Sequence, residues 1–102
     1  LTQIPLSLGG SIDDIFYRMY KQGLKITKKL LANKYTEKKQ NLSSGSIFKR
    51  RKPKDSEITL DEIRKKNSLY LYNKIRMLED PYPNAYIKMR NRKKIYFIKA
   101  KI

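Results

Sequence analysis

Residues 75–86, IRMLEDPYPNAY, place two prolines and two tyrosines directly after an apolar run. A proline disfavours helical geometry in the residue before it, so Pro81 is expected to end a helix. Tyr82 and Pro83 then predict an extended corner, and Ala85 is expected to begin a strand. The stretch therefore predicts a junction between a helical part of the chain and a β-sheet.

Arg76 lies near the end of the helix that precedes this corner. Its guanidinium presents several N–H donors in a fixed planar arrangement. We interpret Arg76 as a structural residue that pairs with Glu79, Asp80 or a backbone carbonyl, in preference to a substrate ligand.

Two helices are predicted before the junction. Thr59 and Glu62 have the spacing of a capping box, which indicates a short helix over residues 60–65. Asn67 is a favourable cap for a second helix over residues 69–78. The apolar face of this second helix consists of Leu71, Tyr72, Ile75 and Leu78.

A longer amphipathic helix is predicted over residues 12–33, with Ser11 and Asp14 as its capping box. Apolar residues recur at helical spacing on one face, and they are Ile12, Ile15, Phe16, Met19, Ile26 and Leu30. Gly23 lies on the same face, where glycine costs roughly 1 kcal/mol relative to alanine. We expect Gly23 to allow close packing against a neighbour.

Beyond the junction, residues 85–89 and 95–102 predict two strands, joined by a turn over residues 90–93. Apolar and basic residues alternate in the second strand, which is typical of a sheet with one solvated face. After Pro83 the chain has no acidic residue, and its basic residues are Lys88, Arg90, Arg92, Lys93, Lys94, Lys99 and Lys101.

The remaining segments have weaker signals. Residues 2–8 contain a proline and predict an edge strand or an extended segment, residues 34–46 predict a polar surface loop, and residues 47–48 predict a brief strand. The basic run that follows is either an anion-binding cluster or a solvated loop, and it consists of Lys49, Arg50, Arg51 and Lys52.

The formal net charge is +16, from 25 basic and 9 acidic residues. Such a charge indicates a polyanionic partner, or else a lysine-rich composition of the kind that AT-rich coding sequences produce. The chain has no cysteine and no histidine. We therefore expect no thiolate or imidazole metal site and no Ser-His or Cys-His catalytic pair.

The chain begins with Leu1 and ends on an apolar run, so we expect it to be a piece of a longer protein. No apolar run approaches the roughly 18 residues that span a bilayer. We expect no contact with a membrane, and a cytoplasmic protein.

Four segments are informative in combination: residues 4–11 (IPLSLGGS), 48–58 (FKRRKPKDSEI), 71–78 (LYNKIRML) and 81–86 (PYPNAY). In this order and spacing they resemble the formyltransferases that use 10-formyltetrahydrofolate. This family includes methionyl-tRNA formyltransferase and the formyltransferases of amino sugars. The segments resemble, in turn, the approach to the last long helix of the catalytic domain, the tail of that domain, a linker helix, and a corner before a small β-barrel.

The resemblance implies an α+β fragment from the C-terminal part of such an enzyme. Residues 1–58 would be the end of a Rossmann-like α/β catalytic domain. Residues 59–79 would be a helical linker, and residues 80–102 would begin the C-terminal β-barrel domain.

The resemblance also implies that the parent enzyme moves a formyl group from 10-formyltetrahydrofolate to an amine. In the family, an asparagine, a histidine and an aspartate carry this step, and none of their positions lies within this chain. We therefore expect no catalytic residue here, a cofactor bound mainly by residues outside this chain, and no activity from these residues alone.

The resemblance leaves the acceptor amine open between initiator methionyl-tRNA and a nucleotide-linked amino sugar. The tail over residues 48–58 is slightly closer to the sugar enzymes or unassigned members, whereas the basic turn over residues 90–94 suits a tRNA. The candidate substrate-binding residues are Lys49, Arg50, Arg51, Arg90, Arg92, Lys93 and Lys94.

A competing interpretation is a small basic RNA-binding module, such as a ribosomal-type protein. Aromatic side chains beside basic residues can stack on bases, and those available are Tyr82, Tyr86, Tyr96 and Phe97.

Overall fold

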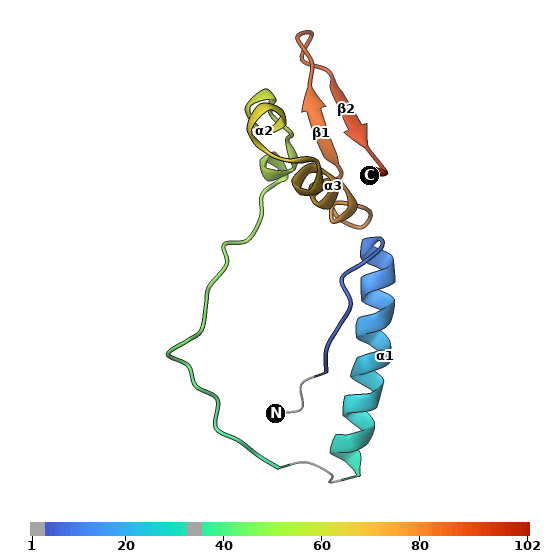
Figure 1. Cartoon of the computed structure of the whole chain (residues 1–102), viewed down its shortest axis with the longest axis vertical. Helices are drawn as coiled ribbons and strands as arrows, with labels where there is room; N and C mark the ends of the chain where they lie inside the picture. Colours follow the sequence, from blue (N-terminus) through green and yellow to red (C-terminus); the bar gives the residue numbers. More distant parts are fainter. Residues whose placement is uncertain (1–3, 33–35) are drawn as a thin grey trace. The chain divides into compact units, whose positions relative to one another are not determined.

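The structure, a computed structural model, describes residues 4–32 and 36–102. Its elements are α1 (Ile12–Leu31), η1 (Pro53–Ser56), α2 (Leu60–Lys65), α3 (Ser68–Arg76), β1 (Ala85–Lys88) and β2 (Lys94–Phe97) (Figure 1). The described residues thus form a small α+β fold with three α-helices and a two-stranded sheet, as expected. The chain divides into two compact units, Leu1–Lys49 and Arg50–Ile102.

The first unit is built around α1, which begins at the predicted capping box. Ser11 Oγ accepts from the backbone N–H of Asp14 at 3.2 Å, and Asp14 Oδ2 accepts from the N–H of Ser11 at 2.9 Å. The latter hydrogen bond is the main reason that the pKa of Asp14 is lowered. The helix ends at Leu31, before the predicted end at residue 33. Asn33 itself lies outside the described residues.

The predicted apolar face of α1 is mostly uncovered within its own unit. Ile12 and Ile15 are buried, whereas Met19 is 51% exposed. A Cβ added to Gly23 meets no atom within 4 Å. The expected close packing at Gly23 is therefore absent from the part of the chain that the structure describes.

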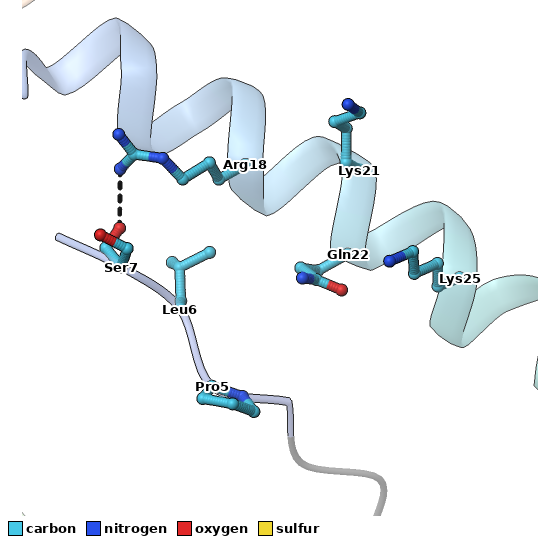
Figure 2. Close-up of a pocket in the computed structure, with 7 residues that line it drawn as sticks. All are labelled: Pro5, Leu6, Ser7, Arg18, Lys21, Gln22 and Lys25. Atoms are coloured by element: carbon cyan, nitrogen blue, oxygen red, sulfur yellow. Dashed lines mark hydrogen bonds between the residues drawn. The ribbon is translucent and has the colours of Figure 1, made fainter. Parts of the chain in front are cut away.

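An extended segment runs beside α1 in the same unit (Figure 1). Arg18 ties it to the helix, because its NH1 donates to the carbonyl of Ser7 at 2.7 Å (Figure 2) and to that of Gly9 at 2.8 Å. Residues 4–9 form no strand, and residues 2–3 lie outside the described residues. Of the two predicted alternatives, the described part is therefore an extended segment.

Residues 36–52 have no regular secondary structure, as predicted for the polar loop. The brief strand predicted at residues 47–48 is wrong. Ile47 is 99% exposed and Phe48 is 88% exposed, and neither belongs to a strand.

In the second unit, both predicted helix starts are confirmed. Thr59 Oγ1 accepts from the N–H of Glu62 at 3.2 Å to cap α2, and Asn67 Oδ1 accepts from the N–H of Tyr70 at 2.9 Å to cap α3. The predicted end of α3 is wrong, because the helix ends at Arg76.

Pro81 therefore does not terminate α3. Met77 is the C-cap, and the N–H of Leu78 donates to the carbonyl of Ile75, a tight turn that breaks the helix ahead of the proline. The Asp80–Pro81 peptide bond is cis.

The sheet is an antiparallel hairpin in which Ala85 pairs with Phe97 and Lys88 pairs with Lys94. Both strands are shorter than the predicted 85–89 and 95–102. Met89 already belongs to the turn, since its N–H donates to the carbonyl of Lys93 at 2.8 Å.

The core of the second unit joins α3 and the segment before α2 to the hairpin. Ile58, Ile75, Leu78 and Ala85 are buried together. The N–H of Ile58 donates to the carbonyl of Tyr86 at 2.7 Å, so the segment before α2 flanks β1 on the side opposite β2. The prediction that Ala85 begins a strand is confirmed, and its side chain is fully buried.

Within the described residues, no helix is both long and apolar enough to cross a membrane.

Candidate functional site

The β1–β2 hairpin has a face that carries two tyrosines and two lysines and points away from Ala85, and Tyr86 on this face is itself buried, with 8% of its surface exposed. Side chains alternate between the two faces of a strand, so Tyr86 and Lys88 share a face with their cross-strand partners Tyr96 and Lys94. The Tyr86 and Tyr96 ring centroids are 5.8 Å apart at an interplanar angle of 54°. Lys94 Nζ lies 4.3 Å from the centroid of the Tyr86 ring, a cation–π contact. We call these four residues the hairpin face.

The hairpin face carries an unfavourable charge pair. Lys88 and Lys94 stand directly opposite each other in the register, and like charges in that position destabilise a sheet. Because no acidic residue follows Pro83, no carboxylate within the hairpin offsets them. An anion bound between the two ammonium groups would relieve this repulsion.

The turn at the end of the hairpin adds further positive charge. Arg90, Arg92 and Lys93 all lie in it and are exposed. Arg92 has a φ of 65°, in the left-handed region that few non-glycine residues adopt. Hydrogen bonds from Arg92 N to Met89 O and from Lys93 N to Asn91 Oδ1 hold this conformation.

A hollow of about 500 Å³ adjoins this turn, and Arg90, Lys93 and Lys94 line it together with the apolar Met89 and Ile95. The structure therefore brings these three predicted basic residues to one concave surface.

The basic run at residues 49–52, the other predicted cluster, does not gather on one concave surface in this way. Lys49 and Arg50 are exposed on irregular backbone at the division between the two units. The Arg51 guanidinium is used locally, because its NH2 donates to the carbonyl of Asp55 at 2.8 Å. The N–H of Lys52 donates to Asp55 Oδ2 at 2.7 Å, so this end of the cluster holds the start of η1.

The corner between α3 and β1 is fixed by local hydrogen bonds. Asn84 Nδ2 donates to the carbonyl of Leu78 at 2.8 Å. The buried Ser56 hydroxyl donates to the carbonyl of Pro83 at 3.2 Å, and the N–H of Tyr82 donates to the carbonyl of Glu79 at 3.0 Å. These contacts hold the prolines and tyrosine of the corner in one conformation.

Arg76 also makes contacts within its own helix. Its Nε donates to Asn73 Oδ1 at 2.7 Å, and its guanidinium carbon lies 5.6 Å from the centroid of the Tyr72 ring. The proposed pairing of Arg76 with Glu79, Asp80 or a carbonyl stays a prediction.

A largely buried ion pair that the sequence did not reveal joins α2 to α3. Lys74 Nζ lies 2.7 Å from Glu62 Oε1, with only 10% and 19% of the two side chains exposed. Lys74 Nζ also donates to the carbonyl of Glu57 at 2.6 Å, and the Tyr70 hydroxyl donates to Glu62 Oε1 at 3.0 Å. The capping box predicted Glu62 as a partner of Thr59 alone.

This arrangement shifts two pKa values. Burial raises the pKa of Glu62, but hydrogen bonds from Lys74, the Thr59 backbone and Tyr70 outweigh it and lower the pKa to about 2. The same hydrogen bond to Glu62 raises the pKa of Tyr70. These hydrogen bonds are made within the cluster, which makes it a structural link between α2 and α3.

Among residues 4–32 and 36–102, no group of three metal-ligating side chains comes together. The hairpin face and the adjoining turn are thus the candidate site. This basic, partly aromatic surface suits contacts with phosphates, which position a nucleic acid without reading its sequence.

Models of known protein families do not match this chain, and a search of curated proteins also finds no match. Among solved structures, methionyl-tRNA formyltransferase from Clostridium thermocellum is similar, with 32% sequence identity and a TM-score of 0.69. The similarity covers 89% of this chain but 44% of that enzyme's chain, so this chain spans less than half of its length. It supports a formyltransferase-like fragment.

Proposed function

We propose that this chain is part of a formyltransferase that moves a formyl group from 10-formyltetrahydrofolate to an amine. The observation that carries the proposal is the similarity in sequence and structure along 89% of the chain to a methionyl-tRNA formyltransferase. The predicted division into a catalytic-domain end (1–58), a linker (59–79) and the start of a β-barrel (80–102) belongs to the same proposal.

The reaction requires a base for the amine proton and donors for the oxyanion of the tetrahedral state. The chain has no histidine, and we assign none of its residues to the cofactor or to these steps. The proposal therefore expects no formyl transfer above background from this chain alone. Transfer by the purified chain would show that the chemistry does not depend on residues elsewhere.

We further propose that the acceptor is carried by a tRNA. One observation supports this acceptor over a nucleotide-linked amino sugar: the structural relative acts on methionyl-tRNA by its name. The opposed Lys88 and Lys94 of the hairpin face suit the phosphates of either acceptor. Lysine contacts with phosphates give binding that weakens with salt.

The test compares two double variants with the same loss of charge. Lys88→Gln with Lys94→Gln removes the opposed pair, whereas Lys28→Gln with Lys29→Gln removes two lysines from α1. We expect the first double variant to bind initiator tRNA more weakly and to flatten the plot of log affinity against log salt by about 1 to 2 units of slope. The α1 variant should bind nearly as the unaltered chain does.

Fluorescence anisotropy with labelled initiator tRNA measures both affinities. Because Lys88→Gln relieves a repulsion, weaker binding by the hairpin variant is not expected to reflect unfolding, and circular dichroism checks this. Equal losses in the two double variants would show that net charge alone attracts the tRNA. Saturable binding of a nucleotide-linked amino sugar in place of tRNA would favour the other acceptor.

A further inference from the structure

One aromatic ring of the hairpin is open to a ligand. The sequence offers four aromatic side chains near the basic turn: Tyr82, Tyr86, Tyr96 and Phe97. Phe97 packs against the core, and Tyr86 is buried with Lys94 Nζ 4.3 Å from its ring centroid. Tyr82 lies in the corner before β1 and is not part of the hairpin. Tyr96 is therefore the accessible ring of the hairpin, with 55% of its surface exposed.

The Tyr96 ring is supported by its cross-strand neighbour. Its centroid is 5.8 Å from that of Tyr86, and the two ring planes are inclined at 54°. Tilted contacts of this kind are among those that aromatic pairs prefer, so Tyr86 restrains the Tyr96 side chain without covering it. A tyrosine side chain also has few rotatable bonds, and a ring restrained in this way loses little conformational freedom when a ligand stacks on it.

The two lysines of the hairpin face lie next to this ring. The Tyr86–Tyr96 and Lys88–Lys94 pairs are successive pairs on the same face, and such positions are about 7 Å apart along a strand. An exposed aromatic ring and two ammonium groups are thus neighbours. This combination matches the two parts of a nucleotide, because a base stacks on an aromatic ring and a phosphate binds cations.

The positive charge continues from the hairpin face into the turn. Arg90, Arg92 and Lys93 are exposed there, and residues 84–102 contain no acidic side chain. A nucleotide-linked sugar brings a single nucleotide, whereas an RNA strand brings a phosphate with each nucleotide. The extent of the positive charge therefore favours a strand over a single nucleotide.

We propose that Tyr96 stacks on an unpaired base of an RNA strand whose phosphates contact Lys88 and Lys94. A base within a duplex is covered on both faces by its neighbours, so the ring requires a base in a single-stranded end, bulge or loop. Every base has a π-face, so the contact accepts any of them. This assignment rests on the proposed function, in which a tRNA carries the acceptor, and it gives the hairpin face an unpaired part of that tRNA in place of a stem.

The test compares a short single-stranded RNA with a duplex of the same strand and its complement, by fluorescence anisotropy with the full chain. We expect the unaltered chain to bind the single strand more tightly, although the duplex has the denser negative charge. Tyr96→Leu should lower the affinity for the single strand about tenfold, which is the loss expected for one stacked base. Its affinity for the duplex should not change.

Two further variants show whether this loss comes from the ring. Tyr96→Phe keeps an aromatic ring, so it should bind the single strand as the unaltered chain does. Tyr20→Leu removes a tyrosine of similar exposure (64%) from α1 and introduces a good helix former. This matched control should leave both affinities unchanged.

NMR of the unaltered chain supplies a measurement that does not depend on how a variant folds. The chain is labelled at its tyrosine rings and titrated with the single strand. A base stacked on a ring moves the proton resonances of that ring upfield. The Tyr96 signals, which are identified by their absence from Tyr96→Phe, should move upfield and saturate, and the Tyr20 signals should not move.

Three results would overturn the stacking of Tyr96 and leave the tRNA acceptor in place: duplex binding at least as tight as single-strand binding, full single-strand binding by Tyr96→Leu, or Tyr96 signals that do not move. Absence of saturable binding to both RNAs and to initiator tRNA would overturn the tRNA acceptor as well. Upfield shifts of Tyr96 at lower concentrations of uridine diphosphate than of the strand would overturn the RNA strand as the occupant and assign the ring to a nucleotide-linked compound.

Discussion

At the scale of single residues, the contact with the largest expected effect on stability is the ion pair between Lys74 and Glu62. Removing one member of a poorly solvated pair is costly because the other charge is left without its partner. Asp61 and Lys65 also form an ion pair at 2.9 Å, but their side chains are 70% and 72% exposed. Exposed pairs contribute little to stability.

Glu62→Gln should destabilise the second unit at neutral pH. The pKa of Glu62 is lowered from 4.5 to about 2, and a shift of this size corresponds to about 3 kcal/mol of stability. Because the folded-state pKa is depressed, this stabilisation is complete above pH 4.5 and is lost as the pH falls toward 2. Urea unfolding at several pH values measures the difference between the two proteins.

Asp61→Asn on the same helix is the matched control, and it should change stability by less than about 0.5 kcal/mol. Two results would contradict the role given to the pair. One is a Glu62→Gln protein as stable as the unaltered chain at neutral pH, and the other is a difference in unfolding free energy that does not become smaller at acidic pH.

At the scale of elements, α1 is a helix with a well-formed start and little tertiary support in its own unit. Its capping box is complete, yet Ile12 and Ile15 are the buried residues along its length. Helices depend mainly on packing of an apolar face. The stability of α1 in this chain should therefore depend on local helix propensity.

Gly23→Ala tests this dependence. A Cβ at Gly23 meets no atom within 4 Å, so alanine should stabilise the helix by about 0.5 to 1 kcal/mol through propensity alone. Helix content measured by circular dichroism should rise and melt at a higher temperature. A lower helix content would show that a neighbour packs against Gly23, as the sequence had suggested.

The sequence predicted where elements begin better than where they end. The helix starts are predictable because local side-chain hydrogen bonds cap them, from Ser11, Thr59 and Asn67. Each of these hydrogen bonds joins residues only three positions apart. The end of α3 and the length of β2 depend on turns and on strand partners, which no local pattern specifies.

The same reasoning applies to the candidate site. The basic turn at residues 90–93 is visible in the sequence, but the opposition of Lys88 and Lys94 requires the hairpin register. Lys74 and Glu62 are twelve residues apart in the sequence and lie on different helices. A local residue pattern does not indicate which of the many lysines pairs with that carboxylate.

At the scale of the whole molecule, the two units should differ in stability. The second unit has a core that joins α3 and the segment before α2 to the hairpin, centred on Ile58, Ile75, Leu78 and Ala85. The first unit buries only Ile12 and Ile15 among its described apolar residues. Amide exchange is slow where opening requires loss of a packed core.

Hydrogen exchange should therefore show slower exchange at Ile58 and at the end of α3 than at Leu24 in the middle of α1. On heating, α1 should melt over a broad range of temperature. The second unit should melt in a separate and sharper transition. A single cooperative transition with equal protection in both units would contradict this description.

We infer that the chain is part of a formyltransferase whose catalytic residues lie elsewhere in the protein. The most direct test is the DNA sequence upstream of the codon for Leu1. We expect the reading frame to continue there and to encode an asparagine, a histidine two residues later, and an Asp-x-Gly loop shortly before Leu1. An in-frame stop codon followed by a start codon directly before Leu1 would contradict it.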